Sequence, residues 1–517
     1  MLVFILFQLA CALYAENLDI KPLSNNELFS TFNFTMQQAI SPIPPIEYSI
    51  FPRSLGEILQ STMTSELHIR FGHGVWDSDS WGALPQNGLI TGGSGVEIWA
   101  FISAADQQHA LRQWNQLVNQ LSGYFCASMG FADETVVTFP SMQAMAPRGG
   151  NMNTILMRAS LPAEPVCTEN LTPFLKLLPC RNKAGLSTML SGNRVFASKW
   201  QTMSVDVFPF EEELRLEQIV SLVSDVKRNF TDPLPYPELE TDLDCDSYRG
   251  DGACFPVKKS EVAFNLTTIF GYFERDLCIL GDAKIKVDLP VGWTVNNDTK
   301  YESILDETIP ELEFVSNGKA SFDNLPPPFI VDRSFSGYGM QNGGVRVVIT
   351  NNRPYPINVR YLESWPHFVK LFMHTLSLGG NGTIVNKTYL PSLNKNSAFL
   401  ELELEIVDSI VLEFEFEKSL LLLEEYPPDA NHGFEISPAL TILKDGDYVY
   451  EDRTPSMLLP LPVPDFSMPY NVVILTSTVM GLAFGTIYNL LVRDVVPLSQ
   501  VPVHSENLLQ KVLKKIK

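Results

Sequence analysis

Histidine and cysteine are scarce in this chain, with seven of each among 517 residues. The histidines form no HExxH pair, the cysteines form no CxxC pair, and no serine lies in a GxSxG turn. These absences exclude the usual motifs of a zincin, a structural zinc site and an α/β-hydrolase. We therefore expect neither a metal site nor a bound cofactor.

Basic residues are also few, since 37 Lys and Arg stand against 59 Asp and Glu, a net charge of −22. No basic patch interleaved with aromatic residues occurs, and there is no internal repeat or low-complexity tract. A chain of this charge is poorly suited to phosphate backbones, so we expect no nucleic-acid partner. The acidic balance is explained simply by solubility.

Two long apolar runs are present. Residues 1–15 begin at Met1 and end in small residues, which predicts a signal peptide cleaved after Ala12 or Ala15. Residues 471–492 carry no charge and are long enough to span a bilayer. The polar residues 493–517 follow, so this segment is a retained anchor rather than a removable GPI-attachment signal.

Lysines after the apolar segment predict a cytosolic tail and a type I orientation, with the large N-terminal part in the lumen. Lys514 and Lys515 resemble a dilysine signal for retrieval to the endoplasmic reticulum (ER), and a basic amphipathic tail lying on the membrane is the alternative. Seven N-x-Ser/Thr sequons, all before the span, predict a lumenal glycoprotein: Asn33, Asn170, Asn229, Asn265, Asn297, Asn381 and Asn386.

The rest of the chain is predicted to be mainly β with some helix (α+β). Apolar residues at helical spacing predict one helix over "ALRQWNQLVNQL" and a second over "EEELRLEQIVSLVSDVKRNF". Period-two alternation predicts a strand in "FLELELEIVDSIVLEFEFEKSLLLL", and further strands are predicted in "VRVVITNNRPYPINVRYLES" and in "SEVAFNLTTIFGYF". These strands favour antiparallel β-sandwich domains.

Composition changes suggest the boundaries. We expect a first lumenal domain of mixed α/β structure at 16–234, an irregular acidic boundary loop at 235–256, a second lumenal β-sandwich at 257–457, and a stiff Pro-rich stalk at 458–470.

Six cysteines remain once the signal is removed, which allows fifteen pairings in an oxidising lumen. Cys126 with Cys167 and Cys245 with Cys254 are candidate internal disulfides. Cys180 and Cys278 are then left, either as a cross-domain pair or as thiols free for a partner. A nucleophilic Cys180 is a further alternative, but no histidine lies near it in the sequence to serve as a base.

The apolar segment carries a stripe of small and polar residues at a spacing of four: Ser477, Gly481, Gly485 and Asn489. Such a stripe lets another membrane helix approach closely, and Asn489 can hydrogen-bond across the contact.

Several motifs, "GVWDSDSWG", "SGVEIWAF", "CTENLTPFLKLLPCRNKAGLS", "SGYGMQNGG", "PPDANHGFEISP" and "LPVPDFSMPYNV", extend from Gly74 to the span. In them the chain resembles the subunit T (PIG-T) family of the GPI transamidase, the ER complex that attaches glycosylphosphatidylinositol (GPI) anchors to proteins.

The resemblance implies a non-catalytic lumenal scaffold that holds the caspase-like catalytic subunit K. It implies that Cys180 forms an intersubunit disulfide with subunit K, and that subunits S and U and an aminopeptidase-like subunit are further partners. It also implies that the span helps to line a groove for the GPI lipid, with candidates Pro469, Tyr470, Asn471 and the stripe. The rival hypotheses are a stand-alone ER-cycling cargo receptor or adhesion-type glycoprotein, and a membrane-anchored hydrolase with Cys180 as nucleophile.

Overall fold

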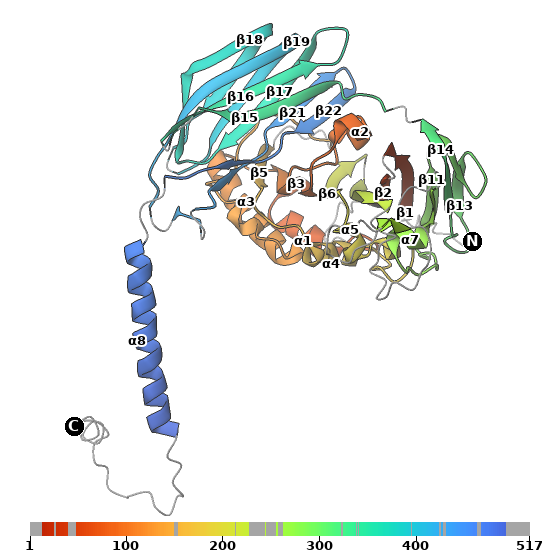
Figure 1. Ribbon diagram of the computed structural model, residues 1–517, viewed down its shortest axis with the longest axis horizontal. Coiled ribbons are helices and arrows are strands. Elements are labelled where there is room, and N and C mark those ends of the chain that lie inside the picture. The colour runs from red at the N-terminus through yellow and green to blue at the C-terminus, as the bar shows by residue number, and fades with distance from the viewer. Residues whose placement is uncertain are drawn as a thin grey trace, which may run out of the picture. The chain divides into compact units, whose positions relative to one another are not determined.

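The computed structural model describes residues 13–24, 27–39, 48–148, 154–211, 213–226, 243–244, 255–256, 262–321, 324–337, 339, 341–393, 395–422, 425–427, 431–462 and 467–492. The chain divides into two compact units, residues 1–461 and 462–517. Strands dominate the first unit, whereas the described part of the second is one long helix (Figure 1). The predicted fold class, mainly β with some helix, is confirmed.

A nine-stranded sheet forms the larger part of the first unit. Only β1 and β11 pair in parallel among its described strands. Its order is β13 (Tyr301–Leu305), β11 (Asp282–Val287), β1 (Leu13–Leu23), β2 (Glu27–Ala39), β7 (Glu213–Asp225), β6 (Trp200–Phe210), β3 (Thr64–His73), β4 (Gly95–Ile102) and β5 (Ile155–Leu161).

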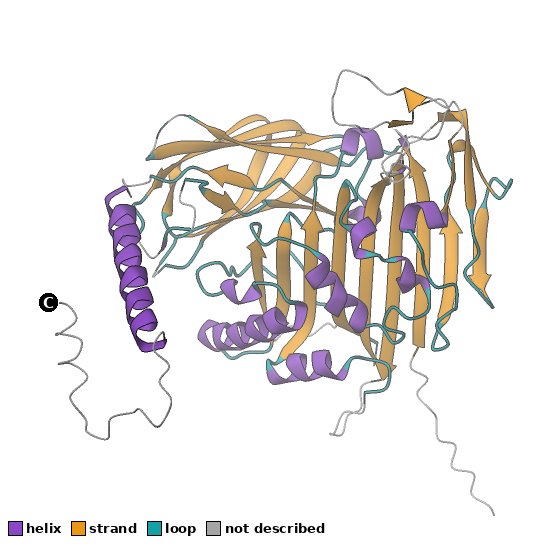
Figure 2. Ribbon diagram, turned by 60° about the horizontal axis from the view of Figure 1, so that its bottom comes forward, coloured by secondary structure: helices purple, strands orange, loops and turns teal. Residues whose placement is uncertain are grey.

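Helices cover one face of this sheet, as Figure 2 shows. The longest, α3, buries Trp114, Leu117 and Leu121 against the sheet and begins where the Asp106 carboxylate accepts a hydrogen bond from the His109 N–H at 2.7 Å. The predicted helix at this position is therefore confirmed. The helical segments are α1 (Arg53–Ser61), α2 (Ser78–Trp81), η2 (Pro85–Gly88), α3 (Gln107–Phe125), η3 (Met129–Phe131), α4 (Thr168–Lys176), η4 (Leu186–Met189), α5 (Gly192–Val195) and α7 (Leu266–Phe270).

The second predicted helix is wrong, because its residues form strand β7. Every residue of β7 from Glu213 to Asp225 has a register partner on β2, and those from Glu213 to Val223 also have one on β6. Leu216 and Val220 face the helix-covered core, while Ile219 on the opposite face is also buried. A central strand with two buried faces loses its alternation, so its apolar residues can imitate helical spacing.

Of the two predicted cleavage positions for the signal peptide, the start of β1 at Leu13 favours the one after Ala12. Tyr14 is only 2% exposed and belongs to the core, and it donates a hydrogen bond to Glu16 at 2.8 Å. Cleavage after Ala15 would remove this core residue, whereas cleavage after Ala12 keeps the strand whole. The signal peptide itself stays a prediction.

The predicted domain boundary at 235–256 is too early. Strands β11 and β13 lie beyond it, yet both belong to the nine-stranded sheet. The three-stranded sheet of β10 (Val262–Asn265), β14 (Glu313–Ser321) and β12 (Val291–Val295) also packs into the same core through Phe264, Trp293 and Phe314. Of the boundary loop, only β8 (Leu243–Asp244) and β9 (Phe255–Pro256) are described.

The second half of the first unit starts at β15, and its arrangement as a β-sandwich domain stays a prediction. Its seven-stranded sheet runs β15 (Phe329–Ser336), β16 (Asn342–Asn351), β19 (Ala398–Lys418), β17 (Ile357–Trp365), β21 (Leu440–Asp445) and β22 (Tyr448–Arg453), and β18 (Val369–Leu390) pairs with the other side of β19. A small sheet of β20 (Phe434–Ile436) and β23 (Met457–Leu459) accompanies it. The strands predicted at β16, β17 and β19 are confirmed, although β19 ends at Lys418, before the leucines that the prediction included. The segment "SEVAFNLTTIFGYF" forms a strand only at β10 and then helix α7.

The predicted stalk at 458–470 is not one element. Leu459 and Leu461 are buried, with 1% and 3% exposure, so the first part is packed within the first unit. Helix α8 (Ser467–Val492) already begins before Tyr470. At 26 residues it is roughly 39 Å long, and its segment Tyr470–Val492 is apolar enough to cross a membrane.

Candidate functional site

The surface around Cys180 is positioned by helix α4. Leu171, Phe174 and Leu175 of this helix are buried in the core, and so are Leu177 and Leu178 directly after it. Cys180, two residues further, is half-buried and packs at the edge of the same core. The "FLKLLPC" motif thus buries its leucines and brings the cysteine to the surface.

Cys180 is bonded to Cys278, with a Cα–Cα distance of 5.9 Å across 98 residues of sequence. The cysteine count left two alternatives, and the structure contains the internal pair, although both cysteines lie in the half built on the nine-stranded sheet. The expectation that Cys180 is free for a partner is therefore corrected. An intersubunit bond from Cys180 stays a prediction, and it requires this internal disulfide to open.

The loop after Cys180 is held in an exposed turn. Arg181 and Asn182 have φ angles of 49° and 58°, in the left-handed region, and the Lys183 N–H donates to the Cys180 carbonyl at 3.0 Å. Gly185, with φ 84°, has no room for a Cβ, which would lie 2.4 Å from the Glu16 carboxylate. The loop is therefore fixed at both ends, and the Arg181 and Lys183 side chains stay exposed.

Glu16 anchors this loop from the core. Its carboxylate accepts hydrogen bonds from the Leu186 N–H at 2.6 Å and from the Tyr14 hydroxyl at 2.8 Å. Burial raises the pKa of Glu16, although these two hydrogen bonds act in the opposite direction.

Apolar side chains are exposed next to Cys278, the other cysteine of the disulfide. Cys278 is only 3% exposed, but Ile279 next to it is 95% exposed and Leu280 is 48% exposed. We call Cys180, Arg181, Lys183, Ile279 and Leu280 the Cys180 surface. It combines a reachable disulfide, two positive charges and an exposed apolar turn, which are features of a protein-docking surface.

The predicted Cys126–Cys167 disulfide is wrong, because both thiols are free. Asn170 explains the spacing that suggested the pair: its amide accepts a hydrogen bond from the Cys167 N–H at 2.8 Å and donates to the Cys126 carbonyl at 3.1 Å. The segments are therefore joined by an asparagine rather than by sulfur. Cys245 and Cys254 lie outside the described residues, although their neighbours Asp244 and Phe255 are register partners.

The predicted glycosylation sites differ in exposure. Asn297, Asn381 and Asn386 are exposed, Asn33 and Asn265 are half-buried, and Asn229 lies outside the described residues. Asn170 is only 1% exposed, and its amide also donates to the Phe125 carbonyl at 3.1 Å. A glycan on Asn170 would replace these hydrogen bonds, so the folded chain has no room for one there.

The small-residue stripe lies open on α8. A Cβ added at Gly481 or Gly485 would meet nothing within 4 Å, and Ser477 and Asn489 are exposed. Tyr470 is 58% exposed and Asn471 is exposed, whereas the Pro469 side chain and Lys514 and Lys515 lie outside the described residues.

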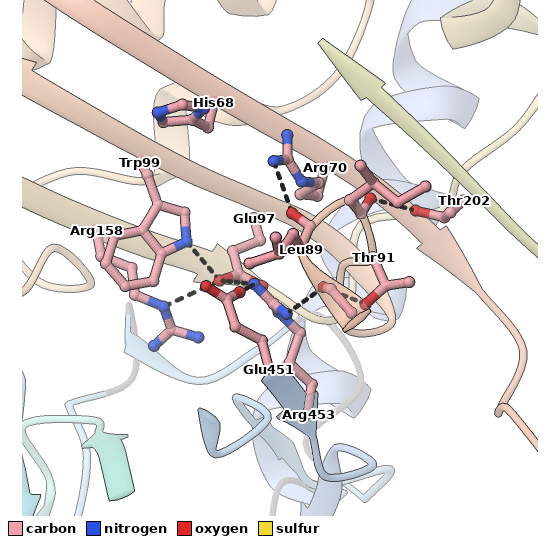
Figure 3. A network of polar contacts seen from close by, with 12 residues as sticks. His68, Arg70, Leu89, Thr91, Glu97, Trp99, Arg158, Thr202, Glu451 and Arg453 are labelled. Carbon is pink, nitrogen blue, oxygen red and sulfur yellow. Dashed lines mark hydrogen bonds and ion pairs between the residues drawn. The ribbon is translucent and has the colours of Figure 1, made fainter. Parts of the chain in front are cut away.

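A buried charge network that the sequence analysis did not find joins the two halves of the first unit (Figure 3). Glu97 on β4 accepts from the Nε atoms of Arg453 on β22 and Arg158 on β5, at 2.7 and 3.1 Å, and from the Trp99 indole at 2.6 Å. Arg453 also pairs with Glu451 at 3.0 Å. Burial disfavours the Glu97 carboxylate, but Arg453 and Arg158 outweigh it and hold its pKa well below the ordinary value. The available signal was a charged residue inside the apolar run "GVEIWAF".

Beside this network, His68 and Arg70 of β3 contact Asp206 of β6, at 2.6 and 2.7 Å. Burial opposes ionisation of Asp206, yet Arg70 and His68 keep its pKa well below the usual range. Each of these charges has a counter-charge, and the arrangement is that of a structural ion-pair cluster.

The fold and the Cys180 surface define a large β-rich protein with one apolar C-terminal helix and an exposed surface suited to docking. A model of the family described as "Gpi16 subunit, GPI transamidase component" matches residues 1–517, and the chain belongs to this family.

Relatives cover most of its length. The GPI transamidase component GPI16 of Saccharomyces cerevisiae is 36% identical, with 94% of this chain and 89% of the relative covered. The PIG-T homolog of Schizosaccharomyces pombe is 33% identical over 97% and 94% of the two chains. The human component PIGT is 29% identical over 92% and 90%.

Among solved structures, a membrane-anchored protein of Corynebacterium diphtheriae covers 88% of this chain and 92% of its own, at 8% identity and a TM-score of 0.19. A Vibrio harveyi β-N-acetylglucosaminidase covers 26% of this chain and 19% of its own, at 13% identity and a TM-score of 0.17. Neither likeness is strong enough to inform the fold.

Proposed function

We propose that this chain is the non-catalytic scaffold subunit of an ER GPI transamidase complex. In this role it holds a caspase-like catalytic subunit on the lumenal side of the membrane. The observation that carries the proposal is the Cys180 surface, where a reachable disulfide lies next to an exposed isoleucine and two cationic side chains. Family membership supports it and counts against the stand-alone receptor alternative.

The internal disulfide gives a route to a covalent link. A thiolate of the catalytic subunit attacks the Cys180 sulfur, a new S–S bond forms, and Cys278 leaves as a thiolate that takes up a proton. No separate oxidant is needed, because one disulfide replaces another. Attack is directed to Cys180 because Cys278 is 3% exposed, and the nearby Arg181 and Lys183 attract an incoming thiolate.

A non-reducing gel of the purified complex tests this link. Wild type should give a reducible band that contains the catalytic subunit, and Cys180→Ser should lose it. Cys278→Ser should keep or strengthen the band, since Cys180 is then free. Cys126→Ser, which removes an exposed free thiol, is the matched control and should change nothing. A band that survives Cys180→Ser would refute the role of Cys180.

The apolar helix supports a single-pass type I arrangement with the first unit in the lumen. We assign the stripe Ser477, Gly481, Gly485 and Asn489 to packing against membrane helices of subunits S and U and the aminopeptidase-like subunit. Together with Pro469, Tyr470 and Asn471 it lines the groove for the GPI lipid. The open surface at Gly481 and Gly485 supports this assignment.

Substituting bulky residues for the glycines of the stripe tests whether α8 packs against other membrane helices or only anchors the chain. Gly481→Leu with Gly485→Leu should reduce co-purification of the other membrane subunits in mild detergent, because two leucines keep a partner helix at a distance. Leu482→Ile, a neighbouring apolar exchange on the same helix, is the control. Unchanged co-purification of the double variant would show that the stripe makes no contact in the complex.

A further inference from the structure

A cavity of about 370 Å³ lies inside the first unit, between the two ends of the seven-stranded sheet. It is bordered by residues 329–332 of β15, residues 452–455 at the end of β22, and residues 91–94 of the loop before β4. The two terminal strands converge here, since the rings of Phe329 and Tyr450 are 5.5 Å apart.

Four consecutive residues of β15 line this cavity. Because successive strand residues point to opposite faces of a sheet, a cavity that touches all four must lie along the edge of the strand. Among the described strands, β15 pairs only with β16. In an antiparallel pair, alternate residues direct both N–H and C=O away from the partner, so two of the four present their backbone groups to the cavity side.

The opposite wall contains the other terminal strand, β22, which pairs only with β21 among the described strands, and the two residues that follow it are already hydrogen-bonded. The Thr454 N–H donates to the Ala439 carbonyl at 3.0 Å, and the Pro455 carbonyl accepts from Arg333 at 3.2 Å. Gly92 and Gly93 contribute a third wall without side chains. The cavity is therefore a slot along the free edge of β15, and the four lining residues of this strand correspond in length to an extended chain of about four residues, roughly 13 Å long.

The charge in the slot is negative and unbalanced. Asp332 and Asp452 line it, whereas the lining cation Arg453 is already engaged by Glu97 and Glu451. No ion pair of the Asp452 carboxylate occurs among the described residues, and its burial raises its pKa to about 6. Arg453 favours the Asp452 carboxylate from a distance without outweighing its burial, so a basic group entering the slot would meet a carboxylate that makes no ion pair of its own.

We propose that this slot binds an extended polypeptide segment of another protein, which pairs as an added strand with β15 and places a basic side chain against Asp452. Strand addition of this kind derives affinity from backbone hydrogen bonds and selectivity from alternate side chains. The proposal does not depend on the Cys180 surface, because the two sites share no residue.

Selection from a phage-displayed library of random heptapeptides on the purified full-length protein tests the proposal. Val75, a lining residue that is 63% exposed, is replaced by tryptophan to fill the slot. Ile304→Trp, on the 67% exposed Ile304 of β13, is the control for an added surface tryptophan. Enriched peptides should carry a basic residue and should bind the control but not Val75→Trp. The proposal is overturned if no peptide is enriched, or if every enriched peptide still binds Val75→Trp.

A synthetic copy of an enriched peptide then tests the binding mode. N-methylation of alternate residues should weaken binding roughly tenfold, because two backbone hydrogen bonds are lost. Asp452→Asn should weaken binding of the basic peptide but leave a norleucine analogue unchanged. If the N-methylated peptide binds as tightly as the unmethylated one, strand addition is refuted. If Asp452→Asn weakens the basic peptide and its norleucine analogue equally, the role of Asp452 is refuted.

Discussion

Replacing Glu97 by glutamine removes the anion at the centre of the buried network. Glu97 lies on β4 of the nine-stranded sheet, and Arg453 lies on β22 of the seven-stranded sheet, so their ion pair crosses between the two halves of the first unit. The glutamine keeps the size of the side chain and one acceptor for the Trp99 indole. It leaves Arg158, whose side chain is 1% exposed, without its carboxylate partner.

The size of the effect follows from burial. Removing one partner of a buried ion pair costs about 3–5 kcal/mol, because the remaining charge stays buried and uncompensated. The entropy of unfolding of a unit this long is on the order of 1 kcal/mol per kelvin, so the midpoint should fall by roughly 3–5 °C. The pKa of Glu97 is lowered from 4.5, so its stabilisation is present at neutral pH and is lost as the pH falls through the folded-state pKa.

Thermal unfolding of the full-length protein in detergent, followed by tryptophan fluorescence at pH 7, measures the effect. Arg346→Met is the control, since Arg346 is 52% exposed and lies 3.7 Å from Glu413, and it should cost roughly 0–1 kcal/mol. Replacing Glu97, Arg158, Arg453 and Glu451 together by methionine should be less harmful than Glu97→Gln alone, because no charge of the network is then left buried without a partner. A Glu97→Gln midpoint no lower than that of Arg346→Met would refute the argument.

Three further predictions concern single side chains. Burial raises the pKa of Asp452 from 3.8 to about 6, so folding loses stability as the pH rises through this range. Asp452→Asn should therefore stabilise the protein at pH 7.5, by up to roughly 3 kcal/mol. Below pH 3.8, the ordinary pKa of the aspartate, the substitution should have no effect, and unfolding measured at pH 7.5 and below pH 3.8 checks both expectations. Asn297→Gln should remove one glycan on a mobility gel, whereas Asn170→Gln should leave the glycan number unchanged and lower the unfolding midpoint. Gly185→Ala should destabilise by about 1–3 kcal/mol, because φ 84° and the Glu16 carboxylate leave no place for a Cβ; an unchanged urea midpoint would contradict this.

Elements with one buried face were predictable from the sequence. Helix α3 and strand β19 show a clear period because one side meets the core and the other meets water. Strand β7 was misassigned because both of its faces are buried, so the repeat that distinguishes strand from helix is lost.

The domain boundary and the disulfides depended on contacts distant in sequence. The acidic composition of residues 235–256 indicates a loop, but it carries no signal that β11 returns to pair with β1. The cysteine count offered the Cys180–Cys278 pair as one of two alternatives, and the choice between them depended on that same return of the chain. The Glu97 network was missed because Arg158 and Arg453 lie 61 and 356 residues from Glu97 in the chain.

The late arrival of Arg453 has a consequence for biosynthesis. A chain made from its N-terminus completes β4 and β5 long before residue 453 is translated, so Glu97 and Arg158 first meet without their third partner. The apolar contacts of Trp99 and Phe101 with Leu440 and Ile442 must also wait for the same stretch. Nascent chains therefore expose this surface until synthesis is almost finished. A chain truncated before β22 would keep the surface exposed, where chaperones can bind it, and would not complete the fold.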